Sequence, residues 1–424
     1  MAPTLRALLV STLLGLASAQ GLAGKTKEVH PKVTTYRCTK KSGCKKQTNY
    51  IVLDSAIHPI YQKNNPSLGC GNWGSGPNST VCPDEKTCAK NCLIDGINNY
   101  SKHGVVVNGD SIFLDMLKDS DKSVLSPRIY LLRENKKDYE MLQLTGKEFS
   151  FDVDVSKLPC GMNGALYLSE MHKRGGPSSL NKAGAELGAG YCDAQCYATP
   201  FIDGVGNIGG KGACCPELDI WEANRATTHF APHPCNITGP YKCTGEAECG
   251  WDGVCDEWGC GQNPYANGDP KFYGPGPKFK INTLKKLTVV TQFEANKKGT
   301  LVSYHRYYVQ NGKKIVPPNA TQSWLPPVNY MDDPYCDATG GATRYLALGA
   351  TKGMGEALSR GMVLAMSVWW DEGSFMTWLD GGSHGPCNDT EGAPANIRKI
   401  QPDTSVTFSN IRWGDIGSTQ SKCT

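Results

Sequence analysis

Apolar and polar side chains alternate with a period of two along much of this 424-residue chain, whereas the period typical of amphipathic helices hardly appears. The segments 149–154 and 405–409 are the clearest examples of this alternation. Successive side chains of a strand point to opposite faces. The pattern therefore predicts strands with one buried face and one polar face.

A stretch near the middle of the chain has the pattern of an antiparallel meander. Residues 288–294 and 301–310 read as strands joined by a turn at 297–299. The dipeptide Asn311-Gly312 follows, which is favoured in two-residue hairpin loops and leads into a third strand at 314–316.

A longer apolar run, 361–370, suits a strand that is buried on both faces, and residues 354–360 just before it are the best candidate for a short helix. The 48 glycines and 26 prolines are spread through long irregular connections, with no internal repeat and no linker. We therefore predict an all-β sandwich with elaborate loops.

The N-terminus has the pattern of a secretory signal peptide. Arg6 precedes the apolar run 7–16, and Ala17-Ser18-Ala19 then offers a small-residue cleavage site. We expect removal of residues 1–19, leaving residues 20–424 as a single secreted, extracellular domain.

The remaining bulk properties exclude two classes of partner. No later apolar run approaches the roughly 18 residues that a membrane helix requires. The net charge is only +4, with Lys and Arg scattered along the chain. Neither a membrane nor nucleic acid is an expected partner, and we expect a monomer.

Nineteen cysteines in a secreted chain indicate a disulfide framework rather than metal sites. The odd count leaves one thiol over, and Cys423 beside the C-terminus is the best candidate. Five glycosylation sequons agree with a secretory route: Asn78, Asn99, Asn236, Asn319 and Asn388.

Three acids, Glu217, Asp219 and Glu222, fall within six residues whose other members are large and apolar. In a strand, Glu217 and Asp219 share a face while Glu222 is out of phase by one position. A β-bulge between Asp219 and Glu222 would bring all three acids to one face, leaving Leu218 and Ile220 for the core. We predict that bulge.

Such a row has a chemical use, because retaining glycoside hydrolysis needs two carboxyl groups about 5–5.5 Å apart. Two glutamates have the necessary reach, and Asp219 between them can hydrogen-bond one neighbour. The alternatives are a solvated outer face of a sheet and a calcium site.

The surroundings of the acid row suit a sugar, whose apolar ring faces stack on aromatic side chains. Any one of the aromatic residues could instead be an ordinary core or surface residue, and His233 could have a purely structural role. The candidates for a cleft are Tyr167, Tyr191, Trp221, Trp369, Trp370 and Trp378, with Asp193, Gln195 and His233 as polar groups.

The motif at 217–222 resembles glycoside hydrolase family 7, the fungal cellulases, and the resemblance extends over essentially the whole mature chain. Supporting stretches occur in the family's order at 28–31, 82–84, 126–128, 158–161, 190–196, 272–276 and 409–414.

This resemblance implies a jelly-roll sandwich of two curved antiparallel sheets, concanavalin-like, with long disulfide-tied loops and a glucan-binding groove on the concave face. It implies a retaining mechanism with Glu217 as the nucleophile, Glu222 as the acid/base and Asp219 hydrogen-bonded to the nucleophile. His233 matches the family's active-site histidine. No cofactor and no metal are implied.

The family also assigns the substrate-binding residues. Tyr167, Tyr191, Asp193 and Gln195 match residues on the non-reducing side of the scissile bond, where Trp369 matches a stacking tryptophan. Trp378 matches the platform for the ring beyond the bond.

The family's disulfide pattern uses every cysteine except Cys423. The bridge from Cys160 to Cys387 would close most of the chain into one loop and argues against two independent domains. The implied pairs are Cys38–Cys44, Cys70–Cys92, Cys82–Cys88, Cys160–Cys387, Cys192–Cys215, Cys196–Cys214, Cys235–Cys255, Cys243–Cys249 and Cys260–Cys336.

Short connections at 196–214, 249–255 and 378–387 resemble the endoglucanase branch, whose groove is open, rather than the tunnel of cellobiohydrolases. The segment 54–61 lacks the family's distant aromatic platform, and Ala266 replaces a product-binding arginine. We expect no carbohydrate-binding module after the last predicted strand. We therefore expect an endo-1,4-β-glucanase (cellulase) acting on a β-1,4-glucan polysaccharide.

Three alternatives stay open at this stage. They are an end-acting cellobiohydrolase of the same family, an enzyme acting mainly on xylan or mixed-linkage glucan, and a non-catalytic glycan-binding protein.

Overall fold

The computed structural model describes residues 21–71, 76–321, 325–339 and 342–422. The signal peptide predicted for residues 1–19 and Cys423, the cysteine predicted to be unpaired, both lie outside the described residues. No helix in the described ranges is long and apolar enough to cross a membrane.

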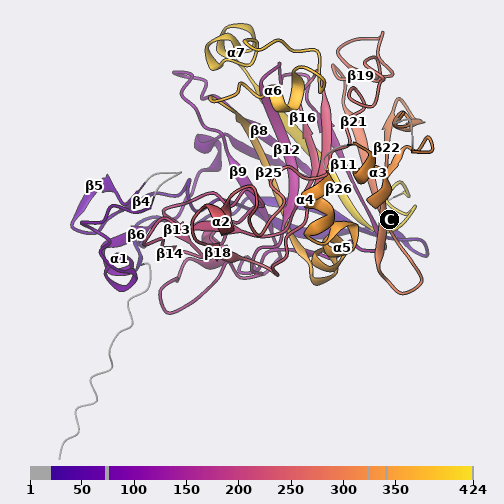
Figure 1. The fold of residues 1–424 in the computed structure, drawn as a ribbon. Helices are drawn as coiled ribbons and strands as arrows, with labels where there is room; N and C mark the ends of the chain where they lie inside the picture. Colours follow the sequence, from indigo (N-terminus) through magenta and orange to yellow (C-terminus); the bar gives the residue numbers. More distant parts are fainter. Residues whose placement is uncertain (1–20, 72–75, 322–324, 340–341, 423–424) are drawn as a thin grey trace, which may run out of the picture.

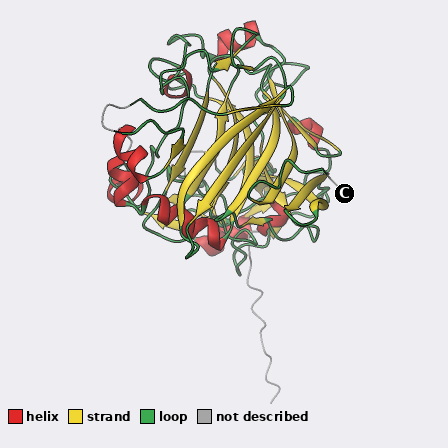
Figure 2. Ribbon diagram, turned by 90° about the vertical axis from the view of Figure 1, so that its right-hand side faces the viewer, coloured by secondary structure: helices red, strands yellow, loops and turns green. Residues whose placement is uncertain are grey.

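Long strands dominate the fold (Figures 1 and 2). The main ones are β2 (Lys32–Thr39), β3 (Gly43–Leu53), β9 (Arg128–Leu132), β11 (Lys147–Asp154), β12 (Met162–Ser169), β16 (Glu217–Ala223), β17 (Thr228–His233), β21 (Leu287–Ala295), β22 (Leu301–Gln310), β23 (Lys313–Ile315), β25 (Met362–Trp370) and β26 (Ser405–Asp415). They pair in the order β17-β16-β12-β25-β9-β3-β2-β26-β11-β21-β22-β23. Within this order the β2–β26 pair is parallel, over Tyr36 to Cys38.

This hydrogen-bonded path folds back on itself into two layers. Phe151 of β11 packs edge-on against Trp221 of β16, with ring centroids 6.1 Å apart, although the two strands are far apart in the pairing order. Phe408 of β26 packs on the same phenylalanine. A single hydrophobic core therefore fills the space between the layers, which are joined through the β2–β3 hairpin. The predicted sandwich is confirmed.

Strand β25 is buried on both faces of the layer that it forms with β16 and β12. Its even-numbered residues 362 to 368 belong to the core between the layers, whereas Val363 and Ala365 join a second apolar cluster on the opposite face. The predicted doubly buried strand is confirmed. The meander is confirmed as β21-β22-β23, and the short helix before β25 is α5 (Ala350–Arg360), which begins four residues earlier than expected.

The remaining elements are short, and the helices lie around the periphery of the strands (Figure 2). The minor strands are β1 (Gly21–Leu22), β4 (Ile60–Gln62), β5 (Asn65–Gly69), β6 (Cys92–Ile94), β7 (Val105–Asn108), β8 (Ser111–Asp115), β10 (Met141–Leu142), β13 (Phe201–Ile202), β14 (Val205–Gly206), β15 (Gly212–Cys214), β18 (Tyr241–Cys243), β19 (Tyr273–Gly274), β20 (Ile281–Asn282) and β24 (Tyr330–Met331). The other helices are α1 (Glu85–Asn91), α2 (Glu246–Cys249), α3 (Asp333–Thr339), α4 (Ala342–Ala347), α6 (Thr377–Asp380), α7 (Pro394–Ile400) and the 3₁₀ turns η1 (Tyr100–His103) and η2 (Gly184–Leu187).

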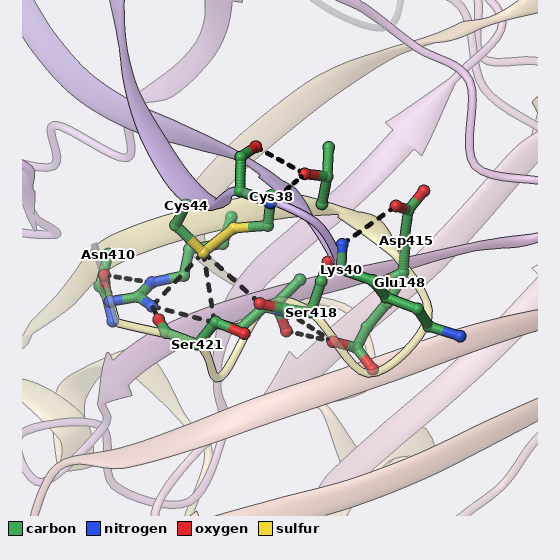
Figure 3. The surroundings of a disulfide bond; sticks show 12 residues. Cys38, Lys40, Cys44, Glu148, Asn410, Asp415, Ser418 and Ser421 are labelled. Atoms are coloured by element: carbon green, nitrogen blue, oxygen red, sulfur yellow. Dashed lines mark hydrogen bonds between the residues drawn. A yellow bond between two sulfur atoms is a disulfide. The ribbon is translucent and has the colours of Figure 1, made fainter. Parts of the chain in front are cut away.

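All nine disulfide pairs that the family pattern implied are present among the described residues. Cys38 and Cys44 join opposite positions of the β2–β3 hairpin, where the chain's C-terminal segment is anchored (Figure 3). There Glu148 accepts hydrogen bonds from the amides of Gly417 and Thr419, each 2.9 Å long. Cys44 of β3 also donates from its backbone amide to the carbonyl oxygen of Lys422, so the end of the chain is fastened to both β11 and β3.

Candidate active site

The acid row lies on β16, and a bulge aligns it. The register between β16 and β17 shifts between Asp219 and Glu222, which places Glu217 opposite His233 and Glu222 opposite His229. The bulge prediction is confirmed. Leu218, Ile220 and Trp221, the apolar residues of the same strand, are fully buried in the core between the layers.

His233 is held from both sides of its ring. Its Nδ1 donates to the carbonyl oxygen of Asp256 at 2.8 Å, and its Nε2 lies 3.0 Å from Oδ2 of Asp219. Burial lowers the pKa of His233, but the hydrogen bond to Asp219 and the charges of Asp219 and Glu217 outweigh burial and raise it from 6.5 to about 10. The imidazolium is therefore the counter-charge of Asp219.

Glu217 is 4% exposed and accepts a hydrogen bond from the Ala194 amide at 3.1 Å. Burial, then the charges of Asp219 and Asp193, raise its pKa well above the ordinary value. Burial and the charge of Glu222 raise the pKa of Asp219 from 3.8 to about 6. The row is a set of buried acids that compete for few counter-charges, as is typical of acid/base sites.

Glu222 has partners that the sequence did not indicate. Asn163 of β12 donates to its Oε1 at 2.8 Å, and the Asn163 side-chain oxygen accepts from the amide of Ala223 at 3.2 Å. Nδ1 of His229 lies 3.5 Å from Oε2 of Glu222. One Glu222 oxygen is thereby fixed, while the other faces an imidazole.

The face of the sheet that carries the second apolar cluster also carries the predicted tyrosines. The Tyr167 hydroxyl donates to the Tyr191 hydroxyl at 3.4 Å, and the Arg128 guanidinium lies 3.4 Å from the centroid of the Tyr191 ring. Arg128 in turn donates to a carboxylate oxygen of buried Asp54 at 2.8 and 2.9 Å. The ion pair therefore supports the tyrosine platform from beneath, a role that sequence reasoning missed for Arg128.

Asp193 and Gln195 lie on the loop that carries Ala194. Asp193 is 4% exposed, and its Oδ1 has no hydrogen-bond partner among the described residues. A buried carboxylate oxygen without a partner has unused capacity to accept a hydroxyl. Gln195 donates to the carbonyl oxygen of Glu257 at 3.3 Å, which joins this loop to the loop that follows Cys255.

Trp369 and Trp378 lie together, with ring centroids 6.1 Å apart and planes inclined by 30°. Trp369 is opposite Asn163 in the β12–β25 ladder, so this pair borders the Glu222 end of the acid row. Two other aromatics proposed for the cleft are core residues instead. Trp221 is fully buried, and Trp370 is 9% exposed in the core cluster with Arg398 over its ring.

Three groups of potential metal-ligating side chains occur among the described residues, and each is built on disulfide-bonded cysteines. Their sulfurs are not available as thiolate ligands. The acid row itself has the His233 imidazolium as its nearest cation.

Comparison with known proteins agrees with this geometry. The model of the family described as glycosyl hydrolase family 7 matches residues 22–420. The chain is 57% identical to endoglucanase EG-1 of Humicola insolens over 97% of this chain and 94% of that protein, and 57% identical to endoglucanase type C of Fusarium oxysporum over 98% and 96%.

Solved structures give the same result. The structure of the Humicola insolens endocellulase EGI superposes with a TM-score of 0.91 at 57% identity, covering 93% of this chain and 99% of that one. A family 7 cellobiohydrolase from Daphnia pulex superposes with a TM-score of 0.86 at 33% identity, covering 94% and 100%. With the family model matched over nearly its whole length, this chain belongs to glycosyl hydrolase family 7 and is a glycoside hydrolase.

Proposed function

We propose that this protein is a secreted, retaining endo-1,4-β-glucanase that cuts internal bonds of cellulose and related β-glucans. The observation that carries the proposal is the buried row of Glu217, Asp219 and Glu222 on one bulged strand, beside β12 with its Tyr167–Tyr191 pair. The names of the endoglucanase relatives support the choice of substrate. The mature enzyme would be residues 20–424, a single monomeric catalytic domain.

In the first step, a carboxylate oxygen of Glu217 attacks the anomeric carbon while Glu222 gives its proton to the glycosidic oxygen of the leaving chain. Asn163 occupies Oε1 of Glu222, so Oε2 is the oxygen available to carry that proton. The bond to the leaving chain breaks as the glycosyl–Glu217 ester forms.

In the second step, Glu222 takes a proton from water, whose oxygen attacks the same carbon and releases Glu217. Two inversions give net retention of configuration. Before the attack and after the ester is hydrolysed, the Ala194 amide and the positive charge of His233 favour the ionised form of Glu217, opposing the effect of burial.

We assign Asp219 to the positioning of this machinery. It lies between the glutamates and bonds His233, which is itself fixed by the Asp256 carbonyl. Tyr167, Tyr191, Asp193, Gln195 and Trp369 would bind rings before the scissile bond, and Trp378 the ring after it.

An end-acting cellobiohydrolase is the second candidate, because such an enzyme shares the fold. The short connections favour internal cutting. The sequence separation of Cys196 and Cys214 is 18 residues and that of Cys243 and Cys249 is 6, which leaves little chain to roof a groove.

The test measures viscosity loss against new reducing ends on carboxymethylcellulose. We expect a steep early fall in viscosity per bond cut, and a loss of at least about 10³-fold in turnover for Glu217→Gln. Little viscosity change with steady release of short sugars would indicate end-on action. Activity on xylan or mixed-linkage glucan alone would correct the substrate, and normal turnover by Glu217→Gln would refute the assigned nucleophile.

A further inference from the structure

Two tryptophans outside the acid row are unusually exposed. Trp251 is 48% exposed and Trp258 is 63% exposed, and their rings pack edge to face with centroids 5.5 Å apart. Large aromatic side chains gathered at a surface mark an interaction site more often than single exposed aliphatic residues do. Nothing in the catalytic row or the tyrosine platform uses this pair.

The loops that carry the pair are firmly tied. The bridges Cys235–Cys255 and Cys260–Cys336 bracket residues 256–259, and the Arg344 side chain donates to the carbonyl oxygen of Gly253. A stacking surface held in this way loses little conformational entropy when it binds a ligand.

The same loop forms one wall of the catalytic site. The Asp256 carbonyl oxygen accepts from His233, and the Glu257 carbonyl oxygen accepts from Gln195. Gly259, with a φ of +68°, lies so close that an added Cβ would come within 2.7 Å of the His233 ring. Trp258 therefore lies between two residues whose backbones border the site.

The order of the strands places this wall beside β17, at one edge of the acid row. In the layer that contains β12, β16 and β17, Tyr167 lies on β12 and the acids lie on the next strand, β16. Strand β17 pairs with the other side of β16 and ends the pairing order. Residues 256–259 pack on His233 of β17. The loop that carries Trp258 thus packs on the β17 edge of the acid row, whereas Tyr167 lies on β12, the strand on the other side of β16.

We propose that Trp251 and Trp258 form a stacking platform for glucose rings of the leaving chain, extending the β-glucan site past the bond that is cut. The inference rests on the proposed endoglucanase function. The flat ring faces of the tryptophans complement the apolar C–H faces of glucose, while the half-buried Glu257 between cleft and platform offers a carboxylate to ring hydroxyls.

The test compares wild type with Trp258→Ala and with the double change Trp251→Ala/Trp258→Ala. Substrates are cellohexaose, reducing-end-labelled cellopentaose and a chromogenic aryl cellobioside that is too short to reach the platform. Trp258→Phe is the matched variant that keeps an aromatic face, and Val302→Ala, at a 44% exposed position of β22, controls for loss of surface apolar area.

We expect kcat/KM on cellohexaose to fall by about 3- to 10-fold in the alanine variants, the effect of losing one or two stacking contacts. Turnover of the aryl cellobioside should not change. Cuts in labelled cellopentaose should move toward the reducing end, because binding of rings on the leaving side no longer contributes. Trp258→Phe should retain most of the wild-type preference.

Three results would overturn the platform. An unchanged ratio of long to short substrate with unchanged cut positions would do so, even if adsorption to solid cellulose fell, since the pair would then contact the solid only. An equal loss of kcat/KM on both substrates would mean that the loop only supports His233 and binds no glucose ring. A wild type that cleaves neither substrate would remove the proposed function and this inference with it.

Discussion

Asp380 offers the sharpest test of how the site is supported. It ends α6, two residues after Trp378, and is 1% exposed. Its Oδ2 accepts from the Gly161 amide and from the Asn224 side chain, both at 2.7 Å, so it ties the start of β12 to the end of β16. Burial raises its pKa from 3.8 to about 6, although these two hydrogen bonds oppose the effect.

The raised pKa fixes the sign of a stability change. An unfolded chain releases the Asp380 proton near pH 3.8, whereas the folded protein keeps it until about pH 6. The contribution of the protonated carboxyl is therefore fully present below pH 3.8 and is lost as pH rises through 6. At about 1.4 kcal/mol per pKa unit, the loss amounts to about 3 kcal/mol at neutral pH.

Asp380→Asn removes this loss and keeps a carbonyl oxygen to accept both hydrogen bonds. We expect the variant to be near wild type in free energy of unfolding at pH 3.5 and about 3 kcal/mol more stable, relative to wild type, at pH 7. Guanidinium unfolding at the two pH values measures the difference, with exposed Asp389→Asn on the same loop as control. A variant less stable than wild type at pH 7, or a difference independent of pH, would refute the reasoning.

Two further predictions concern the acid row and the framework. Because the charge of Asp193 adds to burial and Asp219 in raising the pKa of Glu217, Asp193→Asn should move the acidic limb of the kcat/KM profile to lower pH; an unmoved limb would contradict that coupling. Replacing Cys160 and Cys387 by serine opens a bridge with a sequence separation of 227 residues. It should lower the free energy of unfolding by up to about 5 kcal/mol, measurable as a lower melting temperature; an unchanged one would contradict the loop-entropy argument.

Much of the fold could be predicted from local sequence because the alternation of apolar and polar residues in a strand repeats every two residues. Alternation located β11, β21, β22 and β26, and the parity of the acids alone required the bulge in β16. A period-two pattern fixes which side chains share a face, so Leu218 and Ile220 could be assigned to the core before any tertiary contact was known.

The residues that sequence reasoning missed come from other strands. Asn163 reaches Glu222 from β12, and Arg128 supports Tyr191 from β9; no local pattern states which strands become neighbours. His229 was the exception, since it lies four residues before His233 on the same strand and hence on the same face. Its signal was present in the alternation that located the acids.

The structure also indicates why a row of buried acids persists in a folded protein. Ionised carboxyls at 4% to 8% exposure destabilise the folded state, as the raised pKa values of Glu217 and Asp219 record. Behind them Trp221 packs against Phe151 and Tyr273, with ring centroids 6.1 and 6.0 Å apart, so the strand that carries the acids is anchored by aromatic contacts in the core. Cys214 and Cys215, just before the same strand, form disulfides with Cys196 and Cys192. Apolar burial and covalent constraint thus offset the cost of burying these charges. Glu217 and Glu222 each accept a hydrogen bond on one carboxylate oxygen, which leaves the other oxygen for the reaction.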